Sequence, residues 1–419
     1  MTSSSTCCGV AEMATAVLRQ VKGTVRDLIL KVFPGARAQV HRLRNLAIDA
    51  KVALLPGKFI GRYVLPEDEA ARGGGVRNLR VMLPAERVRI GAGDKDPFTR
   101  VAQYYKDGWF DRPDVFVCEI PDANVFVRSG MVCTRDFKLI ADKGMEHRRF
   151  LYPPFRKRRP SSVRRVEGAW TTLAYCNAEN FWHWMVDCLP KIRSLELAMA
   201  GQPLTVCMPS TALGFQRFTL ESALPPNFKL VYLDPETDPW IQPERFIWAS
   251  VASGLCMGVL PKEYYEAIRA PIFKRIGLPA THEKTERLYI SRRNAGHRRV
   301  RNEDALVELL EGYGFRSVQL EKLPFEEQVA LFHRAEIVLG PHGAGLGTIF
   351  FSGDIDLVAL YSTSVAGNYF HSLACGLGQR HFFLCGNENH EDDWFDADLP
   401  AVQRLLENEV GLTRTTVDA

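Results

Sequence analysis

The sequence predicts an α/β protein with doubly wound parallel sheets. From Ala169 onward, apolar runs of strand length alternate with amphipathic segments of helical length, which is typical of parallel strands connected by helices. One of these runs leads straight into a glycine-rich turn at residues 340–347, at the strand end where open α/β sheets bind ligands. At 419 residues the chain also exceeds what one hydrophobic core usually serves, so we expect two domains.

The composition is that of an ordinary globular protein, with 46% hydrophobic and 24% charged residues. No apolar stretch approaches the roughly eighteen residues of a membrane span, and the N-terminus lacks the apolar core and cleavage site of a signal peptide. The ten cysteines form no CxxC pair, so neither a zinc site nor a disulfide framework is supported. We therefore expect a cytoplasmic protein.

Two basic segments precede the α/β pattern. Residues 1–60 form a basic amphipathic segment, which fits a packed surface helix or a helix on a membrane surface. Residues 61–167 carry short apolar runs and are expected to form an accessory α+β region. Its basic, proline-broken loop at residues 148–165 is either a charged linker or a contact with an anionic membrane surface or polyanionic acceptor. No nucleic-acid-binding motif accompanies it, so we expect no nucleic-acid partner.

The first α/β domain is expected at residues 168–275. Its strands are expected at residues 171–175, 204–207, 229–232 and 246–248. A long helix at residues 178–200 should follow the first strand. A segment rich in Pro, Lys and Glu, residues 271–285, is expected to separate this domain from the next.

The second domain is expected at residues 276–395, followed by a C-terminal helix and tail at residues 396–419. Its strands are expected at residues 287–291, 337–339, 357–360 and 381–384, with a further strand ending at Leu320. Asn302 is expected to cap the first helix, because two acidic residues follow it near the positive end of the helix dipole. Pro324 should open the second helix.

The glycine-rich turn reads GPHGAGLG and is expected to bind an anion. Its glycines let the backbone approach a ligand, and the helix expected from Leu346 would offer unpaired N–H groups. A positively charged loop follows strand 287–291; its polar and basic residues are Ser291, Arg292, Arg293, His297, Arg298, Arg299 and Arg301. Arginines bind phosphate oxygens through a fork of donors, so the two loops together predict a diphosphate site. Any one of these arginines alone is more simply a surface residue.

A third group of residues lies early on the predicted first-domain helix. Asn180, His183 and Asp187 share one helix face, so Asp187 can orient His183 across one turn. A carboxylate-oriented imidazole suits a general base that takes a proton from a hydroxyl. A core histidine bonded to a neighbouring acid is the simpler alternative for this pair alone. Trp182 and Trp184 are either core residues or a platform on which a sugar stacks.

These three ordered motifs resemble those of glycosyltransferase family 61, over roughly residues 168–385. NFWHWMVDCLPKI, residues 180–192, is similar to the family's Asn-aromatic-x-His-Trp-x-x-Asp-x-Leu-Pro element. YISRRNAGHRRVRNE, residues 289–303, is similar to its Tyr-Ile-Ser-Arg segment, and residues 320–347 contain its GPHGAGL core. The family groups bacterial capsular-polysaccharide-type enzymes with plant xylosyl- and arabinosyltransferases and animal transferases of N-acetylglucosamine.

The resemblance implies a GT-B architecture, in which two facing Rossmann-like domains bind the donor mainly through the C-terminal one. It also implies the site residues by position. The donor-binding residues are expected to be Ser291, Arg292, Arg293, Arg298, Glu321, Glu326, Pro341, His342, Gly343, Ala344 and Gly345, with the two glutamates near the nucleoside. His183 and Asp187 are expected to be catalytic, and Asn180 and Trp182 to bind the acceptor. Two positions depart from the family: Gly347-Thr348 replaces a common Thr-Asn, and Ala359 stands where a Glu before Leu is usual.

We therefore expect an inverting glycosyltransferase that moves a sugar from a nucleoside diphosphate sugar, specifically a UDP-sugar, to a hydroxyl of a glycan or polysaccharide. Arginine and helix-dipole charge would stabilise the leaving diphosphate, so no metal cofactor is expected. Asp354 and Asp356 match the DxD pattern of metal-using transferases, but such pairs are common. A nucleotide-sugar epimerase on the same scaffold and a catalytically silent polyanion- or glycan-binding protein are the alternatives.

Overall fold

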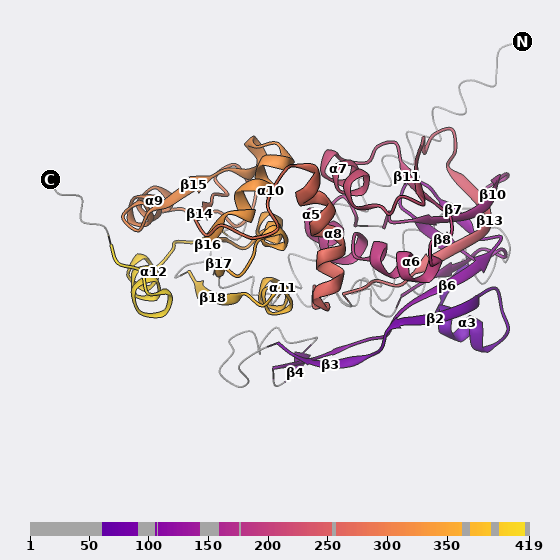
Figure 1. Cartoon of the computed structure of the whole chain (residues 1–419), viewed down its shortest axis with the longest axis horizontal. Helices are drawn as coiled ribbons and strands as arrows, with labels where there is room; N and C mark the ends of the chain where they lie inside the picture. The colour runs from indigo at the N-terminus through magenta and orange to yellow at the C-terminus, as the bar shows by residue number, and fades with distance from the viewer. Residues whose placement is uncertain are drawn as a thin grey trace, which may run out of the picture. The chain divides into compact units, whose positions relative to one another are not determined.

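The computed structural model describes residues 61–90, 105–106, 108–142, 159–175, 177–253, 257–362, 369–386 and 394–414. The basic amphipathic segment at residues 1–60 and most of the basic loop at residues 148–165 lie outside these ranges. Within them, two large sheets contain parallel strands connected by helices (Figure 1). The predicted α/β fold class is therefore confirmed.

The sheet of the C-terminal half is parallel throughout, in the strand order β15-β14-β16-β17-β18. Its strands are β14 (Glu286–Ile290), β15 (Phe315–Val318), β16 (Ala335–Pro341), β17 (Asp356–Tyr361) and β18 (Arg380–Cys385). The chain forms β15 on one side of β14 and then crosses to form β16 on the other side. The direction of winding thus reverses between β14 and β16, and doubly wound sheets bind ligands outside the carboxyl ends of the strands at such a point.

Helices cover both faces of this sheet, which explains why its central strands β14, β16 and β17 are mostly buried on both sides. They are α9 (Glu303–Glu311), α10 (Phe325–His333), α11 (Tyr369–Leu377) and α12 (Leu399–Leu405), with the 3₁₀ helices η4 (Leu320–Lys322) and η5 (Ala344–Phe351) and the π-helical turn η7 (Leu406–Val410). In β16, Ile337 and Leu339 pack in the core beneath α9 and α12, whereas Val338 faces the larger core on the opposite side. A strand buried on two faces needs the uninterrupted apolar run that the sequence shows.

The sheet of the N-terminal half has a parallel part with the strand order β13-β10-β11-β12. These strands are β10 (Arg164–Thr172), β11 (Leu204–Pro209), β12 (Phe228–Leu233) and β13 (Trp240–Ala249). The associated helices are α5 (Phe181–His183), the π-helical turn η3 (Trp184–Cys188), α6 (Lys191–Met199), α7 (Gly214–Ala223) and α8 (Lys262–Arg275). Winding reverses here too, between β10 and β13, which places α5 next to the carboxyl end of β13.

The strands of the predicted accessory region extend this same sheet. Strands β6 (Val115–Pro121) and β7 (Asn124–Phe126) pair antiparallel with β13. The others are β1 (Gly61–Val64), β2 (Arg77–Leu83), β8 (Met131–Cys133) and β9 (Lys138–Ile140), with helix α3 (Pro66–Ala71). Phe116 and Ile120 of β6 share a core with Phe246 of β13, so hydrophobic contact and backbone pairing both join the two regions. A small separate sheet contains β3 (Glu86–Arg89), β4 (Tyr105–Lys106) and β5 (Trp109–Arg112).

Three local expectations were wrong. The helix expected at residues 178–200 is broken: α5 passes into η3, where Leu189 N–H donates to the carbonyl of Trp184 five residues back, and Pro190 then precedes α6. The separating segment does not begin at Pro271, because α8 continues through that proline to Arg275. The helix after the glycine turn is a 3₁₀ helix that already begins at Ala344.

The prediction that Asn302 caps a helix was correct for its position and wrong for its side-chain hydrogen bond. Asn302 stands at the N-cap position of α9, but its side chain does not bond the helix backbone. Instead its amide exchanges two hydrogen bonds with the backbone of Ala397, both of 2.9 Å. Asn302 thereby attaches the segment before α12 to the start of α9.

The two large sheets share one hydrophobic core. Met185 and Val186 of η3 belong to the same cluster as Leu288 of β14 and Ile349 of η5. Helix α5 contacts η5 directly. Because α5 follows β10 and η5 follows β16, the segments beyond the carboxyl ends of these two strands meet each other.

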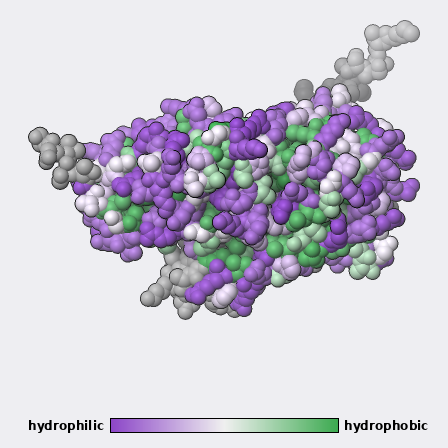
Figure 2. All heavy atoms as spheres, viewed as in Figure 1, coloured by the Kyte–Doolittle hydropathy of each residue, from purple (hydrophilic) through white to green (hydrophobic). Residues whose placement is uncertain are grey.

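Hydrophilic residues cover most of the face seen in Figure 2. The large exposed hydrophobic side chains in the described ranges are scattered over separate elements; they are Val81, Trp109, Leu197 and Leu213. Among the helices that the structure describes, none combines the length and apolarity that crossing a bilayer requires.

Gly130→Ala is expected to destabilise the protein more than Gly168→Ala. Both glycines have positive φ, of 65° and 82°, so either alanine costs about 1–2 kcal/mol in backbone strain. At Gly130 the new Cβ would also collide with the carbonyl oxygen of Ala174, whereas nothing lies within 4 Å at Gly168. Displacing that backbone should cost about 1–3 kcal/mol more. Calorimetry should give the lower Tm for Gly130→Ala, and equal decreases would contradict this account.

Acidification below neutral pH is expected to lower stability through buried histidines. Burial lowers the pKa of His282 and His333, whose rings lie 4.3 Å apart between centroids, and lowers that of His381 further. The unfolded chain then binds more protons, so stability is full above the unfolded pKa of about 6.5 and is lost as the pH falls through the folded pKa. The Tm should decrease between neutral pH and about pH 5.

The matched variant for that measurement is His333→Phe. Phenylalanine keeps a ring against Phe273, which lies 4.8 Å from His333 between centroids, but it cannot be protonated. It should therefore show a smaller Tm decrease over the same pH interval than the wild-type protein. A decrease as large as in the wild type would exclude His333 as a contributor.

Candidate active site

The predicted glycine turn lies at the reversal point of the C-terminal sheet. Strand β16 ends at Pro341, and the backbone N–H of His342 donates to the carbonyl of Leu360 at 2.8 Å. Gly343 is fully extended and stands at the N-cap position of η5. The turn thus leads from a buried strand into the N-terminus of a helix, where free N–H groups attract anions.

Arg292 lies directly against this turn. A Cβ on Gly343 would collide with the Arg292 guanidinium, so the glycine makes room for it. Its Nη2 donates to the carbonyl of His297 at 3.1 Å, and within the described residues its buried Nε has no hydrogen-bond partner. Burial and the nearby charge of Arg298 lower the pKa of Arg292 to about 10. An anion bound here would accept a hydrogen bond from Nε and would raise the pKa of Arg292 again.

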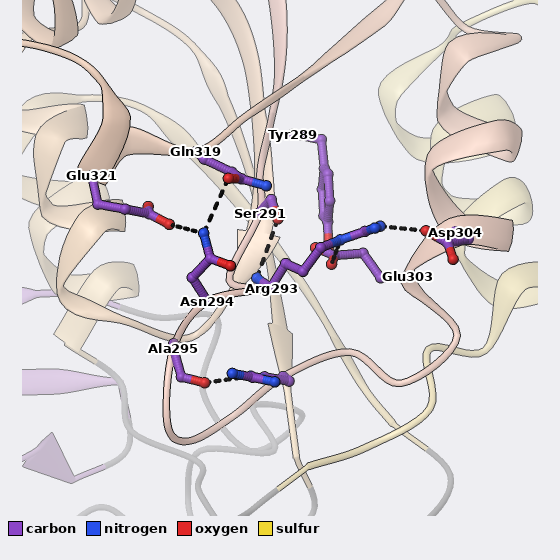
Figure 3. A network of polar contacts seen from close by, with 10 residues as sticks. Tyr289, Ser291, Arg293, Asn294, Ala295, Glu303, Asp304, Gln319 and Glu321 are labelled. Atoms are coloured by element: carbon purple, nitrogen blue, oxygen red, sulfur yellow. Dashed lines mark hydrogen bonds and ion pairs between the residues drawn. The ribbon is translucent and has the colours of Figure 1, made fainter.

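The second predicted arginine holds the loop instead of facing the turn. Arg293 Nε donates to Glu303 at 3.1 Å, and its Nη2 pairs with Asp304 (Figure 3). The buried hydroxyl of Tyr289 donates to the same Glu303 at 2.8 Å, and Ser291 Oγ accepts from the Arg293 N–H at 3.2 Å. The positive charge of Arg293 is therefore neutralised at the start of α9, and Arg292 is left as the arginine of this pair that contacts Gly343.

A carboxylate stands on the other side of the same loop. Glu321 of η4 accepts from Asn294 Nδ2 at 3.0 Å, and the same amide donates to Gln319 at 3.1 Å (Figure 3). Glu321 follows the carboxyl end of β15, the strand next to β14. Glu326 is exposed in the first turn of α10. Asn294 and Gln319 were not predicted, because a polar residue in a loop carries no sequence signal of its own.

The remaining predicted residues of the turn differ in their surroundings. The ring of His342 packs edge-on against Phe370 of α11, with centroids 5.1 Å apart, and lies 5.2 Å from that of Tyr361. Gly345 leaves room for Leu320, whose Cδ1 would lie 3.1 Å from a Cβ there. Pro341 is buried and Ala344 is half-buried.

His183 and Asp187 form the predicted pair. His183 Nδ1 lies 2.7 Å from Asp187 Oδ2, and both residues are buried. An ionised carboxylate only accepts hydrogen bonds, so Nδ1 is the donor of this contact when Asp187 is ionised. The π-helical turn contains Asp187, and such turns often occur at functional sites.

Asp187 has another partner that the sequence did not reveal. Ser253, just beyond β13, donates to Asp187 Oδ1 at 3.1 Å. The two residues are 66 positions apart and meet because β10 and β13 are neighbours in the sheet. Nothing in the local sequence around Ser253 marks it, so only the fold could identify this contact.

The other residues of the motif have structural contacts. Asn180 is the N-cap of α5, and its side chain accepts from the N–H of Trp182 at 3.0 Å. Trp184 is fully buried, and its Nε1 donates to Thr219 at 2.9 Å. Trp182 is only 7% exposed, so in this conformation its ring is a packing residue and offers no open face for stacking a sugar.

Trp182 connects the motifs of the two halves. Its ring meets Phe370 edge-on, with centroids 4.9 Å apart, and Phe370 in turn contacts His342. A Cβ on Gly347 would lie 3.2 Å from Trp182 Cε3. The residue before His183 therefore contacts the end of the glycine-rich segment directly, and contacts His342 through the ring of Phe370.

The two aspartates of the DxD-like pattern lie elsewhere. Asp354 pairs with Lys284 at 3.1 Å, and Asp356 accepts from Arg380 Nε at 2.6 Å. Asp356 begins β17, so both residues lie at the amino end of the sheet, opposite the glycine turn. Within the described ranges, no cluster of His, Cys, Asp and Glu is arranged to hold a metal ion.

Part of the chain matches known proteins. Residues 181–355 match the family Glycosyltransferase 61. A stretch of 92 residues is 36% identical to the EGF domain-specific O-linked N-acetylglucosamine transferase of Drosophila melanogaster, which covers 21% of this chain and 18% of that protein. The chain therefore aligns with less than a fifth of this relative's length. The segment matched to the family contains the His183–Asp187 pair, Arg292 and the glycine turn.

Proposed function

This chain belongs to glycosyltransferase family 61, and we propose that it transfers a sugar from a nucleoside diphosphate sugar to a hydroxyl of a glycan. The observation that carries the proposal is the placement of Arg292 against Gly343 at the sheet reversal, with the glycine turn joined to the residue before His183 through the rings of Phe370 and Trp182. A cation site and an oriented imidazole are the two groups that a transfer from a phosphate leaving group needs.

The donor is proposed to bind at the C-terminal sheet as a UDP-sugar. Its diphosphate would lie between the Arg292 guanidinium and the N-terminus of η5, where N–H groups and charge stabilise phosphate oxygens. Glu321, at the end of the neighbouring strand, would accept hydrogen bonds from ribose hydroxyls, as acidic residues near such a site do in nucleotide-binding sheets. Because the Drosophila relative is an N-acetylglucosamine transferase, UDP-N-acetylglucosamine is the first donor to test.

The proposed reaction inverts the anomeric carbon. The acceptor oxygen bonds to that carbon while the bond to the diphosphate breaks, and His183 Nε2 takes the hydroxyl proton. Asp187 stabilises the imidazolium that forms, since its carboxylate lies 2.7 Å from Nδ1. Arg292 and the helix N-terminus stabilise the negative charge that develops on the leaving diphosphate, so the proposal assigns no step to a metal ion.

The two sheets with their shared core are proposed to represent the GT-B arrangement, with the donor on the C-terminal half and the glycan acceptor on the side of α5. A cytoplasmic location and peripheral binding to a membrane through the basic segments are proposals from sequence alone. The proposed membrane contact would be made by residues 1–60 and 148–165. Neither proposal changes the chemistry proposed at His183 and Arg292.

Arg292→Ala and Gly343→Ala are expected to weaken UDP binding. The first removes the cation, and the second pushes the guanidinium out of its position against the turn. Hydrogen bonds to a charged group contribute about 1.5–3 kcal/mol, so the Kd should rise by roughly ten- to a hundredfold. Titration calorimetry with UDP measures this, with Arg404→Ala, an exposed arginine of α12, as the matched control.

The UDP titration, together with an assay of nucleotide-sugar interconversion, distinguishes the proposed transferase from the two alternative functions. UDP affinity that does not change in Arg292→Ala would contradict the proposed diphosphate site. A chain that binds no nucleotide at all would instead act as a glycan- or polyanion-binding protein. Interconversion of nucleotide sugars without an acceptor would indicate an epimerase.

His183→Ala is expected to lose turnover while it keeps its affinity for the donor. A positioned general base contributes about 10²–10⁴-fold to the rate, and the diphosphate is proposed to bind at Arg292 and η5 instead. Single-turnover transfer or slow donor hydrolysis gives the rate, and UDP titration gives the affinity. If the rate were unchanged, His183 would have no part in the mechanism.

A further inference from the structure

Ser253 is a fully buried serine at the reversal point of the N-terminal sheet. It follows β13 closely and lies beside the segment that leads from β10 into α5, and none of its side chain is exposed. Its hydroxyl donates to Asp187 Oδ1 at 3.1 Å. A buried hydroxyl aimed at a buried carboxylate restricts both groups, because breaking the hydrogen bond would leave two buried polar groups unpaired.

Asp187 is thereby held through both of its oxygens. Oδ2 accepts from His183 Nδ1 at 2.7 Å and Oδ1 accepts from Ser253 at 3.1 Å, and the residue is 1% exposed. Rotation of the carboxylate about its terminal torsion, which is a soft motion in a free aspartate, would break one of these bonds. Ser253 therefore fixes the plane in which the carboxylate meets the imidazole.

The backbone that carries Ser253 is itself anchored. Ser250 exchanges two hydrogen bonds with Phe116 of β6: its N–H donates to the carbonyl at 3.0 Å, and its Oγ accepts from the N–H at 2.9 Å. The N–H of Val251 donates to the carboxylate of Asp142. Ser253 thus projects from a segment tied to the antiparallel strands, not from a freely moving loop.

We infer that Ser253 is a positioning residue that acts through Asp187 to keep the His183 proton on Nδ1 and the lone pair on Nε2. Ser253 touches no reacting atom. The inference rests on the proposed function only for its kinetic consequence, since the tautomer of His183 is a property of the free protein. Ser253, which follows β13, bonds Asp187, and Asp187 bonds the imidazole of His183. The strand β13 is in this way connected to the ring whose Nε2 is proposed to take the acceptor proton.

NMR of the full chain with ¹⁵N-labelled histidine rings tests the tautomer without any substrate. The His183 signals are assigned by their loss in His183→Gln. We expect the Nδ1-protonated form in the wild type and a larger fraction of the Nε2-protonated form in Ser253→Ala. Ser250→Ala is the matched control, because it removes a buried hydroxyl from the same segment that bonds Phe116 instead. Identical tautomer ratios in Ser253→Ala and wild type would overturn the inference.

Kinetics then test the consequence for transfer. Ser253→Ala should lower kcat by about tenfold, a part of what a general base contributes, and should leave KM for the donor within about twofold. The same substitution in a His183→Ala background should cause no further loss, because Ser253 acts only through that histidine. An equal loss in both backgrounds would overturn the inference. If the chain transfers no sugar, the kinetic test contradicts the proposed function, while the tautomer measurement still decides the role of Ser253.

Discussion

The guanidinium of Arg292 occupies the space that any side chain at position 343 would need. This contact requires β14 and β16 to be neighbours, since the two residues follow the ends of those strands, and the sheet order β15-β14-β16 provides that neighbourhood. It also requires a loop that holds Arg292 in place. The pairing of Arg293 with Glu303 and Asp304 supplies this, because it attaches the loop to α9 immediately after Arg292. Arg293 therefore stabilises the loop, whereas Arg292 contacts the glycine turn.

The contact between the two halves depends on a second glycine. Gly347 stands where related sequences commonly have threonine, and a Cβ there would lie 3.2 Å from the ring of Trp182. The missing side chain lets the indole pack against η5 while it also meets Phe370. The ring of Trp182 therefore fills the space that a side chain at position 347 would need. Ala359, the other difference, is fully buried in β17.

Local patterns in the sequence predicted much of the fold and part of the geometry of the candidate site. The central strands β14, β16 and β17 could be predicted because each is a mainly apolar run that the sheet buries on both faces. The His183–Asp187 contact could be predicted because it spans one helical turn. The different roles of Arg292 and Arg293 could not, since adjacent arginines look alike until the fold shows which one meets Glu303. The contact of Ser253 with Asp187 could not be predicted either, because the two residues meet only through the pairing of β13 with β10. Pro271 was misread because tertiary packing keeps α8 helical through a residue that usually ends a helix.

The antiparallel strands β6 and β7 determine which fragments of this chain can fold by themselves. They cover the edge of β13 that the parallel strands leave open, and they share its hydrophobic core. The segment that carries the family resemblance, residues 181–355, contains neither these strands nor β10, the strand between β13 and β11. If it were excised, β13 would lose its partners on both sides and expose two unpaired edges, a common cause of aggregation. The unit by which relatives are recognised is thus smaller than the unit that folds, and any fragment for expression should begin before β1.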